Sequence, residues 1–152
     1  MAGLDLDCSN ADVFAGDGID TIGGSRLTTN WDFLYGEGGV DVIHGNAGVD
    51  FIVGGDGDDL LFGESGSDTI LGGDGDDKIK GGDGADTVEA GNHADQVCGE
   101  GDGDFLYGEG ANDYVYGGDG TDVNDGGTGS SDTCETDGGA NCDFYGLTSC
   151  PW

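Results

Sequence analysis

The chain has 152 residues, of which 36 are glycine and one is proline, and its 33 acidic residues against three basic ones give a formal net charge of −30. Such a charge repels phosphate backbones and anionic lipid, so we expect no nucleic-acid partner and no membrane insertion, and multivalent cations are the natural counter-charge. Glycine at this density without proline excludes collagen and proline-rich linkers, and no apolar stretch reaches the length of a transmembrane helix.

Residues 1–31 are expected to form an irregular N-terminal cap. They contain one repeat-like segment at 15–23, with Asp20 and Ile22, which is out of phase with the repeats that follow and is separated from them by a three-residue insertion. The first residues lack the basic and apolar regions of a signal peptide. The segment just before Asp32 contains no glycine, so a binding site at Asp32 is doubtful.

From residue 32 to residue 134 the chain follows a nine-residue period. Aspartate recurs at Asp32, Asp41, Asp50, Asp59, Asp68, Asp77, Asp86, Asp95, Asp104, Asp113 and Asp122. Two residues after each aspartate stands Leu34, Ile43, Ile52, Leu61, Ile70, Ile79, Val88, Val97, Leu106 or Val115, and the last position is the polar Asn124. A glycine-rich hexapeptide ends at each aspartate after Asp32, most clearly at 54–59 and 72–77.

This period predicts short strands that alternate with glycine-rich turns. The middle residue of each three-residue strand points inward, and two units make one coil of 18 residues. Stacked coils give two parallel sheets around a thin aliphatic core, with aspartates along both edges. One edge carries Asp41, Asp59, Asp77, Asp95 and Asp113, and the other carries Asp32, Asp50, Asp68, Asp86, Asp104 and Asp122.

Stacked carboxylates need a counter-ion. At a spacing near 5 Å, two of them repel by roughly 3 kcal/mol at an effective dielectric of 20. Calcium accepts six to eight carboxylate and carbonyl oxygens in flexible geometry, whereas magnesium demands a tight octahedron. The aliphatic core is small, so we expect calcium binding to drive folding and the calcium-free chain to be disordered.

The repeat matches the nonapeptide G-G-x-G-x-D-x-U-x, in which U is a large apolar residue, and the chain therefore resembles the repeats-in-toxin (RTX), or haemolysin-type, calcium-binding family over residues 12–134. The resemblance implies an all-β, right-handed parallel β-roll (a β-solenoid) with two repeats per coil and several Ca2+ ions in two rows between the turns. It also implies the metal ligands: the carboxylates of Asp41, Asp50, Asp59, Asp68, Asp77, Asp86, Asp95, Asp104, Asp113 and Asp122, and the carbonyls of Gly55, Gly57, Gly73, Gly75, Gly82, Gly84, Gly118 and Gly120. The third-position acids Asp56, Asp74, Asp83 and Asp119 either contact the ion or face water.

Several repeats depart from the pattern. Four carry glutamate at the second position, and His93, Asp102 and Ala111 replace the fourth glycine. Non-glycine residues at positive φ are strained, so these sites are expected to bind calcium more weakly. A catalytic role for His44 or His93 has no support, and no hydrolase or nucleotide-binding motif is present. We expect no enzyme activity.

Residues 135–152 are expected to form a cysteine-bearing C-terminal cap. Three of the five cysteines lie in the last 19 residues, which predicts a disulfide among Cys134, Cys142 and Cys150 in an oxidising compartment, the alternative being that all five are reduced. Cys8 or Cys98 is then the unpaired thiol that could join two chains. Apolar side chains at outward strand positions, around Phe51–Phe62 and Phe105–Tyr116, are candidate surfaces for self-association.

The predicted function is that of a secreted, extracellular calcium-binding structural β-roll, such as a surface or adhesin segment or a self-associating subunit of a matrix or fibre. One alternative is the non-catalytic RTX domain of a larger secreted hydrolase or toxin, although the ending Cys150-Pro151-Trp152 does not resemble a type I secretion signal. The other alternative is a calcium-dependent ligand-binding module.

Overall fold

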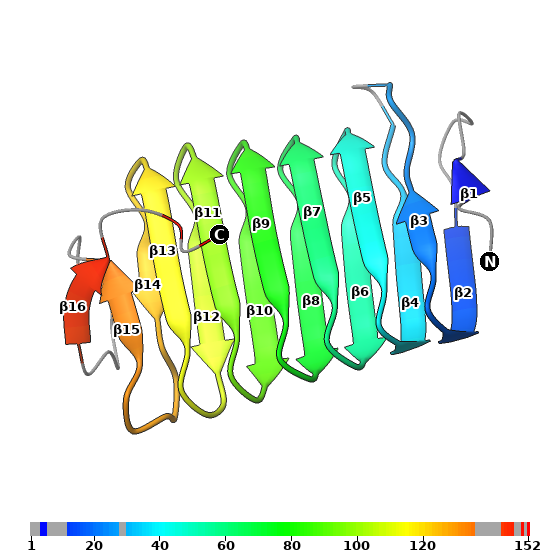
Figure 1. Cartoon of the computed structure of the whole chain (residues 1–152). Coiled ribbons are helices and arrows are strands. Elements are labelled where there is room, and N and C mark those ends of the chain that lie inside the picture. The colour runs from blue at the N-terminus through cyan, green and yellow to red at the C-terminus, as the bar shows by residue number, and fades with distance from the viewer. Residues whose placement is uncertain (1–3, 6–11, 28–29, 136–143, 148–149, 151) are drawn as a thin grey trace.

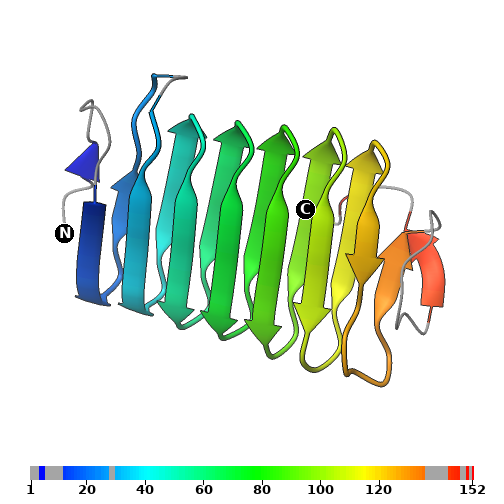
Figure 2. The same ribbon diagram turned by 180° about the vertical axis from the view of Figure 1, so that it is seen from behind.

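The computed structural model describes residues 4–5, 12–27, 30–135, 144–147, 150 and 152. These residues form a parallel β-solenoid of about seven turns, in which two sheets lie face to face (Figures 1 and 2). The all-β solenoid architecture predicted from the repeat is confirmed. No helix among these residues is long and apolar enough to cross a membrane.

The coils place successive repeats in alternate sheets. In spatial order the nine-stranded sheet contains β1 (Leu4–Asp5), β3 (Thr21–Gly23), β5 (Val42–Ala47), β7 (Leu60–Ser65), β9 (Lys78–Asp83), β11 (Gln96–Gly101), β13 (Tyr114–Asp119), β15 (Thr133–Glu135) and β16 (Phe144–Leu147). The seven-stranded sheet contains β14 (Val123–Asp125), β12 (Phe105–Glu109), β10 (Thr87–Asn92), β8 (Thr69–Asp74), β6 (Phe51–Asp56), β4 (Phe33–Gly39) and β2 (Asp12–Gly18).

The strands are longer than the three residues that the pattern predicts. Eight of the sixteen described strands have six residues, because parallel pairing continues into the first three turn positions. Between β6 and β8, for example, Gly55 pairs with Gly73 and Asp56 pairs with Asp74. Between β4 and β14 each paired residue is in register with the one 18 positions away, and each coil there repeats the chemistry of the coil before it.

The core is a double row of aliphatic side chains. All ten predicted inward residues, from Leu34 to Val115, are fully buried. The structure extends the row with Val13 and Ile22 at the N-terminal end and with Cys134 at the C-terminal end. Asn124 ends the row in the seven-stranded sheet, where it is 1% exposed and its Oδ1 has no hydrogen-bond partner.

The turns require positive φ at their second and fourth positions. At Gly57, with φ of 127°, a Cβ would clash with the carbonyl oxygen of Gly39 in the preceding coil. The predicted departures His93, Asp102 and Ala111 all have positive φ, and so do Asn46 and the four second-position glutamates. These non-glycine residues adopt a conformation that costs them energy.

The C-terminal segment lies across the outer face of the nine-stranded sheet. Cys98 on β11 forms a disulfide with Cys150, 52 residues away. The Trp152 ring then lies 6.1 Å from the Phe62 ring and 4.8 Å from Lys80 Nζ. Cys98 is at an outward strand position as predicted, but it is fully buried and bonded, so it is not the free thiol that the sequence suggested.

The other cysteine predictions are answered only in part. Cys150 pairs with Cys98, so a bridge among Cys134, Cys142 and Cys150 would have to leave Cys150 out. Cys134 is also disulfide-bonded. Cys8 and Cys142 lie outside the described residues. The pairing joins positions far apart in the sequence because Cys150 and Trp152 lie against β11, β9 and β7 of the nine-stranded sheet.

The two apolar zones expected from the sequence do not exist as continuous surfaces. Phe51 lies on β6 in the seven-stranded sheet, whereas Phe62 lies on β7 in the other sheet and packs against Trp152. Phe105 and Tyr114 are likewise on opposite sheets, where they are 49% and 46% exposed. Residues that are neighbours in the sequence alternate between the two faces because each coil contains two repeats.

Candidate metal centre

The aspartates form two continuous rows along the edges of the solenoid. In each row the backbone N–H of one aspartate donates to Oδ1 of the aspartate in the next coil, at 2.8–3.0 Å. One row contains Asp20, Asp41, Asp59, Asp77, Asp95, Asp113 and Asp132, and the other contains Asp32, Asp50, Asp68, Asp86, Asp104 and Asp122. The predicted division into two edges is therefore confirmed.

The second carboxylate oxygen is buried and has no protein partner. Leaving aside Asp32 and Asp132, the Oδ2 of every aspartate in the two rows has no hydrogen-bond partner. These aspartates are at most 8% exposed. A buried anionic oxygen without a donor is strongly unfavourable, so the rows need a proton or a cation.

Backbone carbonyls lie beside these free oxygens. At Gly63, the first residue of its turn, an added Cβ would lie 2.5 Å from Asp68 Oδ2 and 2.5 Å from the carbonyl oxygen of Gly81. At Gly36 an added Cβ would lie 2.5 Å from both Asp41 Oδ2 and the carbonyl oxygen of Gly54. Because the first residue of these turns is glycine, there is space beside it. The Oδ2 of the aspartate in the same turn and a carbonyl oxygen from the turn in the next coil both border this space.

Burial raises the pKa of the row carboxyls. The pKa of Asp95 rises to about 8, and those of Asp50, Asp77, Asp86 and Asp113 rise to about 7, because burial disfavours the charged form. For Asp95 the hydrogen bond from Asp77 opposes this shift, while the charges of Asp77 and Asp113 add to it. The pKa values of Asp59, Asp68 and Asp104 rise to about 6 for the same leading reason.

The donor set fits a hard cation such as calcium. The unpartnered atoms are carboxylate oxygens, their neighbours are carbonyl oxygens, and the two lysines lie elsewhere, over the Trp152 ring. Among the described residues no three His, Cys, Asp or Glu side chains gather at one point. A bound ion would therefore depend on carbonyls to complete its shell, which calcium accepts readily.

The site at Asp32 differs from the others. Its Oδ2 accepts a 2.6 Å hydrogen bond from the backbone N–H of Ser25. Gly24 takes the place of the first glycine of this turn. Because of the three-residue insertion it stands eight residues before Asp32, whereas the first glycine of the other turns stands five residues before its aspartate. The loop thus supplies a donor where the other turns leave an unpartnered oxygen. The doubt that the sequence raised about Asp32 has this physical reason.

Ala90 is a departure that the sequence reasoning missed. It stands at the first position of the turn that ends at Asp95, where the neighbouring turns have glycine, and it is fully buried. At the equivalent glycines an added Cβ would press on Oδ2 of the aspartate five residues later. The Ala90 methyl group therefore narrows the site of Asp95, the carboxyl whose pKa is highest.

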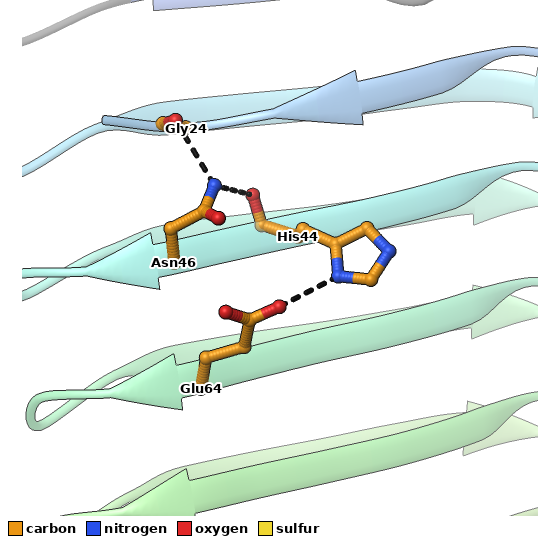
Figure 3. Close-up of polar contacts among 4 residues, drawn as sticks. All are labelled: Gly24, His44, Asn46 and Glu64. Atoms are coloured by element: carbon orange, nitrogen blue, oxygen red, sulfur yellow. Dashed lines mark hydrogen bonds and ion pairs between the residues drawn. The ribbon is translucent and has the colours of Figure 1, made fainter. Parts of the chain in front are cut away.

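Second-position side chains hold neighbouring coils together. Figure 3 shows Glu64 Oε1 at 2.7 Å from His44 Nδ1, and Asn46 Nδ2 donating to the carbonyl oxygens of Gly24 at 3.0 Å and His44 at 3.4 Å. The His44 ring also stacks on Phe62 at 4.7 Å. On the same face Glu100 forms a 3.0 Å ion pair with Lys80. His44 is thus engaged in packing and pairing between coils.

The remaining predicted ligands occupy two other environments. The carbonyl oxygens of the second-position glycines face the backbone of the next coil, as Gly55 does toward Gly73. The third-position acids Asp56, Asp74, Asp83 and Asp119 are all exposed, which agrees with their facing water. The carbonyls beside Oδ2 belong to first-position residues such as Gly54 and Gly81, which the sequence reasoning did not select.

Asp20 and Asp132 are further row members that the nine-residue period alone does not give. Asp20 lies 21 residues before Asp41 because of the insertion, and Asp132 lies 19 residues after Asp113 because of one extra residue. The repeat-like segment around Asp20 was visible in the sequence, but its register was not.

Comparison with known families agrees with this geometry. A family model described as an RTX calcium-binding nonapeptide repeat matches residues 28–61, 35–70, 62–97, 71–106 and 99–132. A search of the curated proteins and a search of the solved structures each found no match.

Proposed function

Because the chain belongs to the RTX calcium-binding nonapeptide repeat family, we propose that it is an extracellular structural module that folds when calcium fills its two aspartate rows. The observation that carries this proposal is the set of buried Oδ2 atoms without partners, repeated from coil to coil. Bound calcium supplies the positive charge that these oxygens lack. The aspartates contribute Oδ2, while their Oδ1 atoms keep successive coils in register.

The wider role that we propose is that of a surface, adhesin or matrix segment. The Cys98–Cys150 disulfide supports an oxidising, extracellular location, since such bonds rarely persist in the cytosol. Phe105 and Tyr114, half-exposed on opposite sheets, each offer one exposed ring as a separate contact for self-association. Sedimentation in saturating calcium should show assembly that Phe105→Ser and Tyr114→Ser together abolish. A single monomeric species at the highest concentration would contradict the assembly role.

The calcium-folding proposal is tested by circular dichroism of the full chain in EDTA and then in millimolar calcium. Calcium should convert a disordered spectrum into a β spectrum, and magnesium at the same concentration should not, because it keeps its water shell. A β spectrum that persists fully at pH 7.5 in excess chelator would refute the proposal.

A matched pair of variants tests the ligands themselves. Asp86→Asn removes charge from a buried row member, whereas Asp83→Asn removes the same charge from an exposed third position of the same turn. The first should raise the calcium midpoint and lower the calorimetric ion count, and the second should leave both near wild type. Equal effects would mean that general charge, and not the rows, governs calcium binding.

A further inference from the structure

The outer face of the seven-stranded sheet carries a cluster of aromatic rings at its N-terminal end. Phe14 on β2 stacks on Tyr35 on β4, with ring centroids 4.7 Å apart and an interplanar angle of 5°. Trp31 meets Phe33 edge to face at 5.3 Å, and Phe33 lies 5.8 Å from Phe51 on β6. The in-register strands hold these rings side by side on one face.

The rings border an open groove of about 310 Å³. Its lining residues are Asp12, Phe14, Trp31, Phe33 and Tyr35, which we call the aromatic platform. Phe14 is 64% exposed, and only one side of its ring is stacked on Tyr35, so the other side is available to a ligand. Burial of such rings removes a large apolar area from water, and ring faces also attract cations.

Charge selects the kind of ligand. Asp12 is exposed, pairs in register with Phe33 at an outward strand position and belongs to neither buried row. Its charge therefore remains when calcium fills the rows. The net charge of −30 repels anions and draws cationic partners toward the surface.

The protein already uses this kind of contact on its other face. Lys80 Nζ lies 4.8 Å from the centroid of the Trp152 ring while it pairs with Glu100 at 3.0 Å. The cation is thus held between an aromatic ring and a carboxylate. The platform offers the same two elements, but both lysines lie on β9 of the opposite sheet and cannot fill it.

We propose that the aromatic platform binds an extended, arginine-bearing segment of a partner protein, with a guanidinium group stacked on Phe14 and paired with Asp12. Arginine suits the site because its planar group stacks on aromatic faces and still donates hydrogen bonds to a carboxylate. This binding is a function separate from calcium binding and needs calcium only to keep the sheet folded.

The test uses the full chain in saturating calcium with Trp152→Phe as background. The chain has two tryptophans, so Trp31 then becomes the single fluorophore. The probe is the peptide Gly-Arg-Gly-Arg-Gly, and its control carries citrulline, which is planar but neutral, in place of arginine. The arginine peptide should change Trp31 emission saturably, and the citrulline peptide should bind at least about fivefold more weakly.

Variants separate the platform from the general negative charge. Phe14→Ser and Asp12→Asn should each weaken binding of the arginine peptide by about two- to fivefold. Phe105→Ser is the matched control, because Phe105 is 49% exposed on the same sheet and in the same register column as Phe33; it should leave binding unchanged. Circular dichroism in calcium checks folding, and Phe14→Leu replaces Phe14→Ser if the serine variant is misfolded.

Three results would overturn the proposal. Equal binding of the citrulline peptide would exclude cation recognition. Equal loss in Phe105→Ser would show that no specific platform exists. A response to a neutral oligosaccharide such as cellohexaose, or to increasing protein concentration alone, without a response to the arginine peptide would assign the platform to a glycan or to a second copy of the chain. Calcium-induced folding would survive each of these outcomes.

Discussion

The Cys98–Cys150 disulfide should lower the calcium concentration at which the chain folds. Replacing Cys150 with serine removes a cross-link between residues 52 apart. In the chain-entropy model a loop of that size is worth about 4 kcal/mol at 25 °C. Counting one ion for each row aspartate from Asp41 to Asp122, about ten in all, this is about 0.4 kcal/mol per ion, and the calcium midpoint should rise about twofold.

The assay is a calcium titration followed by circular dichroism, with the oxidised wild type, the reduced wild type and Cys150→Ser compared at one protein concentration. Trp152→Ala is the matched control, since it keeps the bridge but removes the ring that contacts Phe62 and Lys80. An exposed cation–π contact is worth about 0.5–1 kcal/mol, so this variant should shift the midpoint far less. A midpoint for Cys150→Ser equal to that of the oxidised wild type would refute the loop-closure reasoning. An equal shift in Trp152→Ala would attribute the effect to ring packing instead.

Three further predictions concern the aspartate rows. Asp77→Ala should raise the calcium midpoint more than Asp32→Ala, because Asp32 already has a backbone donor on its Oδ2. Equal midpoints would contradict the inference that the Ser25 N–H takes the place of calcium at Asp32. Ala90→Gly should lower the calcium midpoint and increase the calorimetric heat of calcium binding, because it removes the methyl group beside Asp95. A raised calcium midpoint would mean that the only effect of the glycine is to destabilise the strand. In EDTA the chain should gain β structure as the pH falls from 7.5 to 5. The pKa values of about 6 to 8 in the folded chain exceed the ordinary aspartate value of 3.8. The calcium-free fold is therefore stabilised at low pH and loses that stability as the pH rises through this window. Calcium affinity should change in the opposite direction, because calcium competes with these protons. A loss of β signal on acidification in EDTA would show that burial of these carboxylates does not control the fold.

The sequence by itself determined the architecture of the repeats. A strict nine-residue period places every aliphatic residue from Leu34 to Val115 inside and sorts the aspartates into two edges, since side chains alternate along a strand and two units close one coil. It also identified calcium as the counter-ion, because stacked carboxylates and open turn carbonyls suit that ion. These conclusions depend only on the nine-residue spacing of the aspartates and aliphatic residues, which can be read directly from the sequence.

The tertiary structure decided what depends on insertions and on the return of the chain over itself. Asp20 and Asp132 join a row through register shifts of three residues and one residue, and Ser25 closes the Asp32 site through the shape of its loop. Cys150 pairs with Cys98 because the fold places Cys150 beside β11, 52 residues away in the sequence. Such contacts join positions with no fixed spacing, and the periodic pattern therefore carries no information about them.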